Sequence, residues 1–321
     1  MTMPNFFIIG AQKAGTTSLY RYLDQHPQIY MSPLKEPFFF DNEINSKGEV
    51  VQQRFGGPGR QRAPRFANLE EYRTLFRAVK GEKAIGEASP LYIYAPGTAE
   101  RIKRYVPEAR LIALLRNPAD RAYSAFLQAV RIGVEPLTDF ARALRDEEDR
   151  IRDNWHYAFH YRDRGLYFEQ LERYYRVFGR ERVGVWLYED LRDDPAGVAQ
   201  SVFRFLRVDD AFTPDTFSKY NPAGVPQSEA AHVMIRTMDT AVGVARRTFL
   251  PPTSKVFLFV NRVRQVLQSR MLAKPPPIDP KIRRELLEGY KEDILKLQEL
   301  VGRDLSRWLE DDDRKNASAG G

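Results

Sequence analysis

NFFIIGAQKAGTTSLYRYL, residues 5–23, passes from an apolar run through a glycine-containing turn into the start of a helix. Gly10 and Gly15 have the spacing of the two glycines in a phosphate-binding loop. In the standard form of that loop a lysine follows the second glycine, whereas here Thr16 follows it and Lys13 precedes it. Backbone amides at such a strand-to-helix turn point toward an anion, which the helix dipole also favours. The stretch therefore predicts an anion site with a displaced lysine; a plain turn capped by threonine is the alternative.

Short apolar runs alternate with helical patterns along the chain. The predicted strands are residues 6–9, 83–86, 110–115 and 182–187. The third is apolar after its arginine, which is typical of a strand buried on both faces, and Trp186 and Tyr188 indicate that the fourth is a similar central strand. Strands that alternate with helices favour a parallel sheet covered on both faces. We therefore expect an α/β, P-loop-like fold of three layers, with a mostly parallel sheet of about five strands flanked by helices.

Helices are predicted over residues 16–24, 120–131 and 280–301, the last with Asp279 as its N-cap and Pro280 at its first position. Residues 43–69 are polar and contain clustered glycine and proline, which predicts a surface insertion. The length favours one large core. We expect one domain over residues 1–310 and a disordered tail over residues 311–321.

The composition excludes several kinds of site. The sequence has no cysteine, which excludes disulfide scaffolds, thiolate nucleophiles and cysteine-bound metals. The four histidines lack a recognised metal-ligand spacing, so we expect no metal; they are His26, His156, His160 and His232. No basic segment precedes the first apolar run, and no apolar run reaches about 18 residues. We expect no secretory signal, no transmembrane segment and a cytoplasmic location.

The positive charge is concentrated in one segment. The formal net charge is +7, and residues 222–278, with eight Lys or Arg and two acids, contribute +6 of it. Such a segment is compatible with nucleic acid, a membrane surface or an anionic small molecule. Its basic residues are not interleaved with stacking aromatics, apart from Phe249, Phe257 and Phe259, so we expect no nucleic acid partner. An acceptor lid, a peripheral membrane contact, a dimer face and plain core packing all remain interpretations of this segment.

Four motifs resemble, in the same order, those of the PAPS-dependent sulfotransferases, where PAPS is 3′-phosphoadenosine 5′-phosphosulfate. The family's phosphosulfate loop also has its lysine before the glycine, as in KAGT. The other three motifs are SPLKEPFFFDN (residues 32–42), GEASPLY (86–92) and LLRNPADRAYSAF (114–126). They resemble the base-carrying segment, the E-x-[ST]-P-x-Y segment and the 3′-phosphate motif of heparan-sulfate-type (N- and 3-O-) sulfotransferases. With weaker likeness in RGLYFEQLERYY and LYEDLRDDP, the resemblance covers about the first 220 residues and is nearest to a bacterial-like soluble member.

The resemblance implies PAPS as donor and in-line transfer of its sulfuryl group. Lys13 would stabilise the charge that builds on the oxygen between sulfur and the 5′-phosphate. Arg116 and Ser124 would bind the 3′-phosphate, which ADP and ATP lack. A sulfuryl group carries less charge than a phosphoryl group, so no metal is required. The residues expected to hold the 5′-phosphate are Gln12, Lys13, Ala14, Gly15, Thr16, Thr17 and Ser18.

On the acceptor side, the resemblance makes Glu36 the base that takes the proton of the acceptor hydroxyl. Asp41 would orient Glu36 or the acceptor. A solvated pair with Lys35 is the alternative interpretation of Glu36. His26 is a second candidate for the base, although a histidine before a proline at a helix end favours a structural role.

Departures from the heparan-type pattern bear on the acceptor. Phe38 stands where 3-O-sulfotransferases often have histidine, and Ala88 stands where they have a lysine. The three phenylalanines 38–40 predict an apolar wall, which favours a small molecule, lipid, peptide or neutral glycan with a hydroxyl, or second an amine. Gln128, one turn after Ser124, is predicted to touch the acceptor.

The C-terminal third departs most from the resemblance. The heparan-type K-G-R loop is missing, and Arg270 or Lys274 is its nearest counterpart for the 3′-phosphate. A P-loop kinase or nucleotide hydrolase is the alternative function. The missing lysine after Gly15 and the missing acid for Mg²⁺ argue against it.

Overall fold

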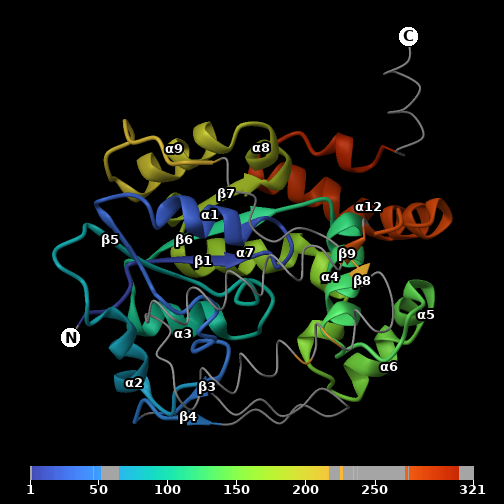
Figure 1. Ribbon diagram of the computed structural model, residues 1–321, viewed down its shortest axis with the longest axis horizontal. Helices are drawn as coiled ribbons and strands as arrows, with labels where there is room; N and C mark the ends of the chain where they lie inside the picture. The colour runs from blue at the N-terminus through green and yellow to red at the C-terminus, as the bar shows by residue number, and fades with distance from the viewer. Residues whose placement is uncertain are drawn as a thin grey trace.

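A parallel sheet forms the centre of the molecule (Figure 1). The computed structural model describes residues 2–45, 47–51, 65–216, 225–226, 234, 237, 272–273 and 275–310. Over these residues the main sheet has five strands in the order β2-β5-β1-β6-β7, and all of its pairings are parallel. The strands are β1 (Phe6–Gly10), β2 (Ile29–Met31), β5 (Ala84–Ala88), β6 (Arg110–Leu115) and β7 (Val183–Leu187). The predicted α/β fold is confirmed.

Helices cover both faces of this sheet. The connection from β1 to β2 runs one way along the sheet and that from β5 to β6 runs the other way, so right-handed crossovers place α1 and α3 on opposite faces. Helix α9 packs on α1, while α7 packs on α3 and α12 packs on α7. The α-helices are α1 (Thr16–Leu23), α2 (Leu69–Arg73), α3 (Thr98–Tyr105), α4 (Pro118–Arg131), α5 (Phe140–Arg145), α6 (Glu147–Arg152), α7 (Tyr167–Phe178), α8 (Tyr188–Asp193), α9 (Pro195–Leu206) and α12 (Pro280–Val301). Short 3₁₀ turns are Thr74–Phe76, Tyr157–Phe159, Asp163–Gly165, Arg180–Arg182 and Ser306–Trp308.

The position of the fourth predicted strand differs from the prediction. Strand β7 lies at the edge of the sheet beside β6, so the expectation of a second central strand is wrong. Its three middle residues are only half-buried, whereas β1 is buried throughout. Trp186 packs outward on Phe205 and donates its indole N–H to Ser201 Oγ at 2.7 Å. Trp186 therefore covers the edge of the sheet and does not lie in a central strand.

The buried face of α4 also differs slightly from the predicted stripe. Phe126 is buried as expected, but Tyr123, Leu127 and Val130 are half-buried. The residues that face the core with Phe126 are mainly alanines, namely Ala119, Ala122, Ala125 and Ala129. Small side chains let α4 pack close to its neighbours. The larger apolar residues Tyr123, Leu127 and Val130 lie beside this alanine face and stay partly exposed.

Parts of two predicted segments fall outside the described residues. The insertion 43–69 contains a small antiparallel pair, β3 (Glu43–Ile44) with β4 (Val50–Val51), and leads into α2. In the basic segment 222–278, strand β8 (Val225–Pro226) pairs with β9 (Leu272–Ala273). The tail 311–321 lies outside the description. Among the described helices, none combines the length and the hydropathy that a bilayer crossing requires.

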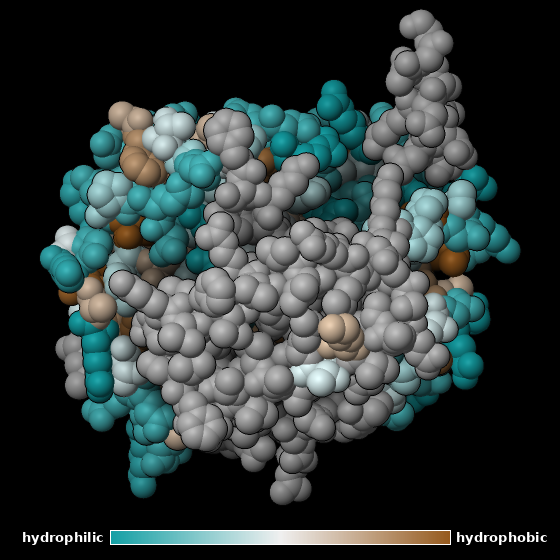
Figure 2. Space-filling model, viewed as in Figure 1, coloured by the Kyte–Doolittle hydropathy of each residue, from teal (hydrophilic) through white to brown (hydrophobic). Residues whose placement is uncertain are grey.

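The described surface is mainly hydrophilic in the view of Figure 2, with apolar residues scattered over it. The most exposed large apolar side chains of the described residues are Met234, Leu295, Val134, Ile132 and Ile151. Single apolar residues of this kind are normal on soluble proteins.

Helix α12 begins at Pro280, with Asp279 capping the amides of Lys281 and Ile282, as predicted. Its buried stripe packs on α7, and its Asp293 accepts hydrogen bonds from the backbone N–H of Tyr167 at 2.8 Å and of Phe168 at 3.1 Å. Asp293 therefore caps the N-terminus of α7 from another helix. Burial raises the pKa of Asp293 to about 6.

Replacing Asp293 with alanine is expected to lower the free energy of unfolding by about 1–2 kcal/mol, because two part-buried amides at the start of α7 lose their acceptor. Asp293→Asn keeps one acceptor oxygen and should lose less. Urea denaturation followed by circular dichroism measures both changes. Equal stability of the alanine variant and the unmodified chain would contradict this capping role.

Candidate functional site

The loop between β1 and α1 has the geometry of an anion site. Gly15 is the N-cap of α1 at φ +89°, and no side chain caps this end of the described helix. A Cβ on Gly15 would lie 3.0 Å from side-chain atoms of Leu191 and Tyr188, so both the backbone conformation and the available space require glycine. The first amides of α1 are thus left for a bound anion. Thr16 is buried, while Thr17 and Ser18 are half-buried.

Lys13 lies among other positive charges. Its backbone has φ +75°, and its side chain is half-buried. Burial, followed by the charges of Arg131 and Arg116, lowers the pKa of Lys13 to about 8. The nearby Glu36 carboxylate acts in the opposite direction. Cations held this close together are stabilised when an anion binds between them.

Arg116 joins the loop to the end of β6. Its Nη1 donates a hydrogen bond to the Lys13 carbonyl oxygen at 3.1 Å, and its guanidinium lies 4.6 Å from the centre of the Tyr188 ring. Asp120, the first acid after Arg116 in the sequence, forms an ion pair with the buried Arg283. The structure therefore brings together two motifs that lie about a hundred residues apart.

Helix α4 carries one donor-side candidate, Ser124, and one acceptor-side candidate, Gln128. Ser124 and Gln128 lie one turn apart on it, and both are half-buried. Their neighbour Tyr123 donates a hydrogen bond to the Pro276 carbonyl oxygen at 3.1 Å, so the segment before α12 passes this helix. Arg270 and Lys274, the predicted contacts to the 3′-phosphate, lie outside the described residues.

Glu36 lies in the loop after β2. Its backbone N–H donates to the Ala88 carbonyl oxygen at 2.8 Å, beside the end of β5. Its carboxylate accepts a hydrogen bond from Lys35 Nζ at 2.6 Å and is 33% exposed. The pair with Lys35 that the sequence left open is therefore present. Because Glu36 also affects the pKa of Lys13, the same carboxylate lies near the anion loop.

The predicted wall of three phenylalanines is wrong for two of them. Phe39 and Phe40 are 1% and 0% exposed, and Phe39 stacks on Tyr72 with 4.5 Å between ring centres. Their backbone N–H groups both donate to the hydroxyl oxygen of the buried Tyr92. These hydrogen bonds hold residues 39 and 40 against the core, with their rings buried. Of the three, only Phe38 is half-buried, and its φ is +53°.

Asp41 lies in the same loop as Glu36, and its Oδ1 accepts a hydrogen bond from Asn42 Nδ2 at 3.2 Å. Its charge acts on Tyr92, Arg101 and Tyr157, and it raises the pKa of the Tyr92 and Tyr157 hydroxyls after burial, the main cause. Asp41 is absent from the described groups that act most on the pKa of Lys13. The charge of Asp41 thus acts on Arg101, and the predicted role of Asp41 beside Glu36 stays a prediction.

His26 has a structural role. It is 2% exposed and packs between the rings of Phe203 and Phe212. Its Nδ1 accepts the Gln28 backbone N–H at 3.0 Å, and its Nε2 donates to the Asp209 carbonyl oxygen at 2.7 Å. Since both ring nitrogens are occupied by backbone groups, the alternative of His26 as the base is wrong.

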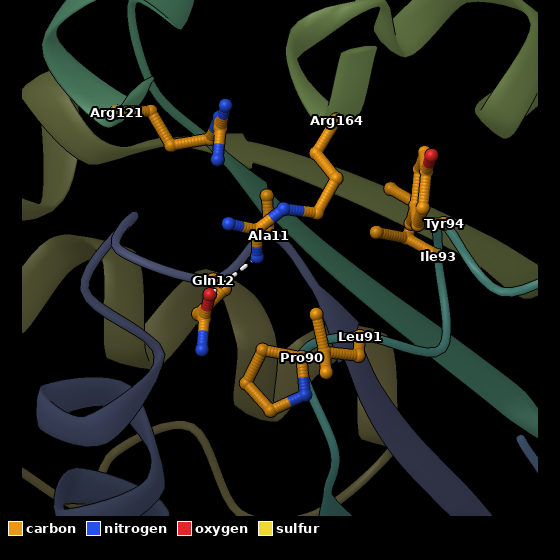
Figure 3. A pocket seen from close by; sticks show the side chains of 8 residues that line it. All are labelled: Ala11, Gln12, Pro90, Leu91, Ile93, Tyr94, Arg121 and Arg164. Carbon is orange, nitrogen blue, oxygen red and sulfur yellow. Dashed lines mark hydrogen bonds between the residues drawn. The ribbon is translucent and has the colours of Figure 1, made fainter. Parts of the chain in front are cut away.

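Sequence reasoning missed a pair of buried arginines behind the loop. Arg164 donates to the Gln12 side-chain oxygen and to the His160 carbonyl oxygen, the second at 2.9 Å. Arg121 and Arg164 are 1% and 3% exposed, and with Gln12 they line a small pocket (Figure 3). Burial lowers the pKa of Arg164 to about 10. Gln12 therefore supports the loop from behind, and no local signal reveals this because Arg164 lies 152 positions away.

A buried carboxylate, Glu87, was also missed. It is 0% exposed and accepts hydroxyl hydrogen bonds from Tyr72 and Tyr92 on Oε1 and from Ser89 on Oε2. The GEASPLY motif that contains three of these residues was the available signal. Within the described part of the chain, no cluster of His, Cys, Asp and Glu is arranged to hold a metal ion.

Comparison with known proteins points to one family. The model of the family described as "Sulfotransferase family" matches residues 4–214. A crystal structure of a sulfotransferase from Alicyclobacillus acidocaldarius is similar over 97% of this chain and 100% of that chain, with a TM-score of 0.70 and 34% sequence identity.

Two curated relatives share shorter regions with the chain. The membrane-associated sulfotransferase kil1 of Dictyostelium discoideum is 33% identical over 156 residues, 47% of this chain and 29% of that protein. The bifunctional heparan sulfate N-deacetylase/N-sulfotransferase 4 of Mus musculus is 31% identical over 216 residues, 64% of this chain and 22% of that protein. The chain thus covers less than a third of the length of either relative.

The ammonium group of the half-buried Lys13 is expected to titrate near pH 8, because its partial burial and the charges of Arg131 and Arg116 lower its pKa. NMR of a chain with ¹³C-labelled lysine side chains measures this midpoint. Replacing Arg131 with glutamine removes a neighbouring positive charge and should raise it. Lys296, whose pKa is raised by its hydrogen bond to Glu292, is the internal control. A Lys13 midpoint as high as that of Lys296 would contradict the described site.

Proposed function

Because the chain belongs to the sulfotransferase family, we propose that it transfers the sulfuryl group of PAPS to a hydroxyl of an acceptor, with an amine as the second choice. The observation that carries this proposal is the hydrogen bond from Arg116 to the Lys13 carbonyl oxygen. It holds a guanidinium beside the loop whose lysine precedes its glycine. One anion site on the loop and a second cation beside it match a donor with two separate phosphate groups.

The donor is proposed to bind with its 5′-phosphate on the first turn of α1. The amides there have no side-chain cap in the described helix, and the hydroxyls of Thr17 and Ser18 are on the same turn. Arg116, with Ser124 on α4, is proposed to bind the 3′-phosphate. Gln12 is held from behind by Arg164, so its role in this proposal is to support the loop.

Lys13 and Glu36 are proposed to carry the chemistry. The acceptor oxygen attacks sulfur, a new S–O bond forms, and the bond between sulfur and the 5′-phosphate oxygen breaks. Negative charge develops on that leaving oxygen, where the Lys13 ammonium stabilises it. Glu36 takes the proton of the acceptor hydroxyl, and the products are the sulfated acceptor and adenosine 3′,5′-bisphosphate (PAP). That Asp41 orients Glu36 or the acceptor stays a prediction of the resemblance.

The proposed acceptor is less charged than a heparan chain. Phe38 is the only one of the three phenylalanines placed to meet it, and the buried Ala88 stands beside Glu36, whose backbone it binds. Phe38 supplies apolar surface, and neither residue supplies a cation for a sulfated sugar. A small molecule, lipid, peptide or neutral glycan with a free hydroxyl fits this surface, and Gln128 on α4 is the proposed polar contact.

PAP is expected to raise the melting temperature strongly, while ADP, which lacks the 3′-phosphate, is expected to raise it little. Replacing Arg116 with alanine should weaken PAP binding about 10- to 150-fold, or about 1.5–3 kcal/mol, because a charged hydrogen bond is lost. Thermal shift and isothermal titration calorimetry measure the two effects. Arg192→Ala, at a 59% exposed arginine, is the control and should bind like the unmodified chain. An equal response to ADP with Mg²⁺ would favour a nucleotide kinase or hydrolase instead.

The Lys13→Ala and Glu36→Gln variants are both expected to lose turnover by about a hundredfold or more. Glu36→Gln should keep its affinity for PAP, because Glu36 contacts the acceptor and not the donor. Transfer of labelled sulfate from PAPS to acceptors in a cell extract measures turnover. Glu292→Gln, at a surface carboxylate, is the control. Full activity of Glu36→Gln would assign the base to another residue.

A further inference from the structure

Glu87, at the end of β5, holds an arrangement of hydroxyl groups around a buried carboxylate. It accepts hydrogen bonds from the Tyr72 hydroxyl at 2.9 Å, the Tyr92 hydroxyl at 3.0 Å and Ser89 Oγ at 2.9 Å. A buried carboxylate is stable only with such donors. In the described residues it has no positively charged partner within ion-pair distance. Its bonds therefore lead to hydroxyls alone.

Two of these hydroxyls hold the loop that carries Glu36. The Tyr92 oxygen accepts the backbone N–H of Phe39 at 3.0 Å and of Phe40 at 3.1 Å, and Ser89 Oγ accepts that of Phe38 at 3.3 Å. A hydroxyl has one hydrogen, and these two donate it to Glu87. Their lone pairs are consequently directed at three successive amides. The carboxylate thus sets which way both hydroxyls face.

The loop needs this support because its backbone is strained. Glu36 has φ +61° and Phe38 has φ +53°. Both angles lie in the left-handed region of backbone conformation, which residues other than glycine rarely adopt. Such conformations persist where the surrounding structure fixes them from several sides. Here the loop is held by four hydrogen bonds. One runs from the Glu36 N–H to the Ala88 carbonyl oxygen, and the other three run from the N–H groups of residues 38–40 to the Ser89 and Tyr92 hydroxyl oxygens. All of them meet residues within five positions of Glu87 along the chain.

We propose that Glu87 is a positioning residue whose carboxylate, through Tyr92 and Ser89, keeps the Glu36 loop in the conformation that accepts the proton. This inference rests on the role of Glu36 in the proposed function. The Tyr72 hydroxyl binds the same carboxylate oxygen as Tyr92 but donates only to Glu87. Tyr72 therefore affects Glu87 without contacting the loop through its hydroxyl.

The positioning depends on pH in a defined direction. Burial raises the pKa of Glu87 to about 7, the hydrogen bonds from Ser89, Tyr72 and Tyr92 act against this, and the charge of Asp41 adds to it. These are the titratable and polar groups that face Glu87 from α2, from the segment after β5 and from the Glu36 loop. A protonated Glu87 becomes a donor, so one of its three hydroxyl partners must reverse its hydrogen bond. When the Tyr92 or Ser89 hydroxyl reverses, its hydrogen points at the loop and an amide loses its acceptor. Transfer should therefore decrease as the pH falls through about 7.

Two variants that each remove one hydroxyl test this. Tyr92→Phe removes the acceptor of two loop amides, and Tyr72→Phe, the matched variant, removes only a donor to Glu87. The probe is the release of PAP from PAPS with water as acceptor, measured from about pH 5.5 to 8.5, with PAP affinity measured in parallel. We expect Tyr92→Phe to lose about tenfold or more in rate at unchanged PAP affinity. Tyr72→Phe should keep the plateau rate, and its acid limb should move to higher pH, because a bond that lowers the Glu87 pKa is lost.

Outcomes of two kinds would overturn the inference. One is a Tyr92→Phe chain with the unmodified rate; the other is a Tyr72→Phe chain with an unmoved acid limb. Amide hydrogen exchange at residues 38–40 is the second measurement and needs no turnover: exchange should be faster in Tyr92→Phe than in Tyr72→Phe, and equal rates would overturn the inference. Glu36→Gln, measured alongside, distinguishes a failure of the proposed function from a failure of the role inferred for Glu87. If it is fully active the proposed base is wrong, whereas if it is inactive and Tyr92→Phe is not, only the role of Glu87 is wrong.

Discussion

The parallel pairing of β1 with both β5 and β6 is the constraint on which the rest of the structure depends. Ile8 lies opposite Ala88 on one side, and Gly10 lies opposite Ala113 on the other. Because the strands run the same way, their carboxyl ends meet at one edge, where ligands bind in open α/β sheets. All three features lie at these strand ends: the anion loop follows β1, Arg116 follows β6, and the buried Glu87 is the second-to-last residue of β5.

Charge at this edge is distributed unevenly. Arg116 and Arg131 lie close enough to Lys13 to lower its pKa. The Glu36 carboxylate raises that pKa. Glu87 is an acid as well, but its bonds lead to hydroxyls and through them to the Glu36 loop. In the proposed function these cations lie at the donor's leaving group and the Glu36 carboxylate lies at the acceptor hydroxyl. This separation is what transfer between two substrates requires.

The sequence predicted elements that have strong local patterns, and it failed where long-range contacts decide. Strands β1 and β6 follow from apolar runs, and the N-terminal cap of α12 follows from Asp279–Pro280. Strand β2 has only three residues and gave no pattern. An apolar run does not say which side of a loop faces the core, so Phe39 and Phe40 were placed on the wrong side. The bond between Gln12 and Arg164 spans 152 positions and has no local signal.

A crystal structure with PAP bound tests the central claim most directly, because it locates both phosphates of the donor product at once. The account predicts the 5′-phosphate on the first-turn amides of α1 beside Lys13, and the 3′-phosphate within hydrogen-bond distance of the Arg116 guanidinium. PAP bound with its 3′-phosphate away from Arg116, or bound off the loop altogether, would contradict it.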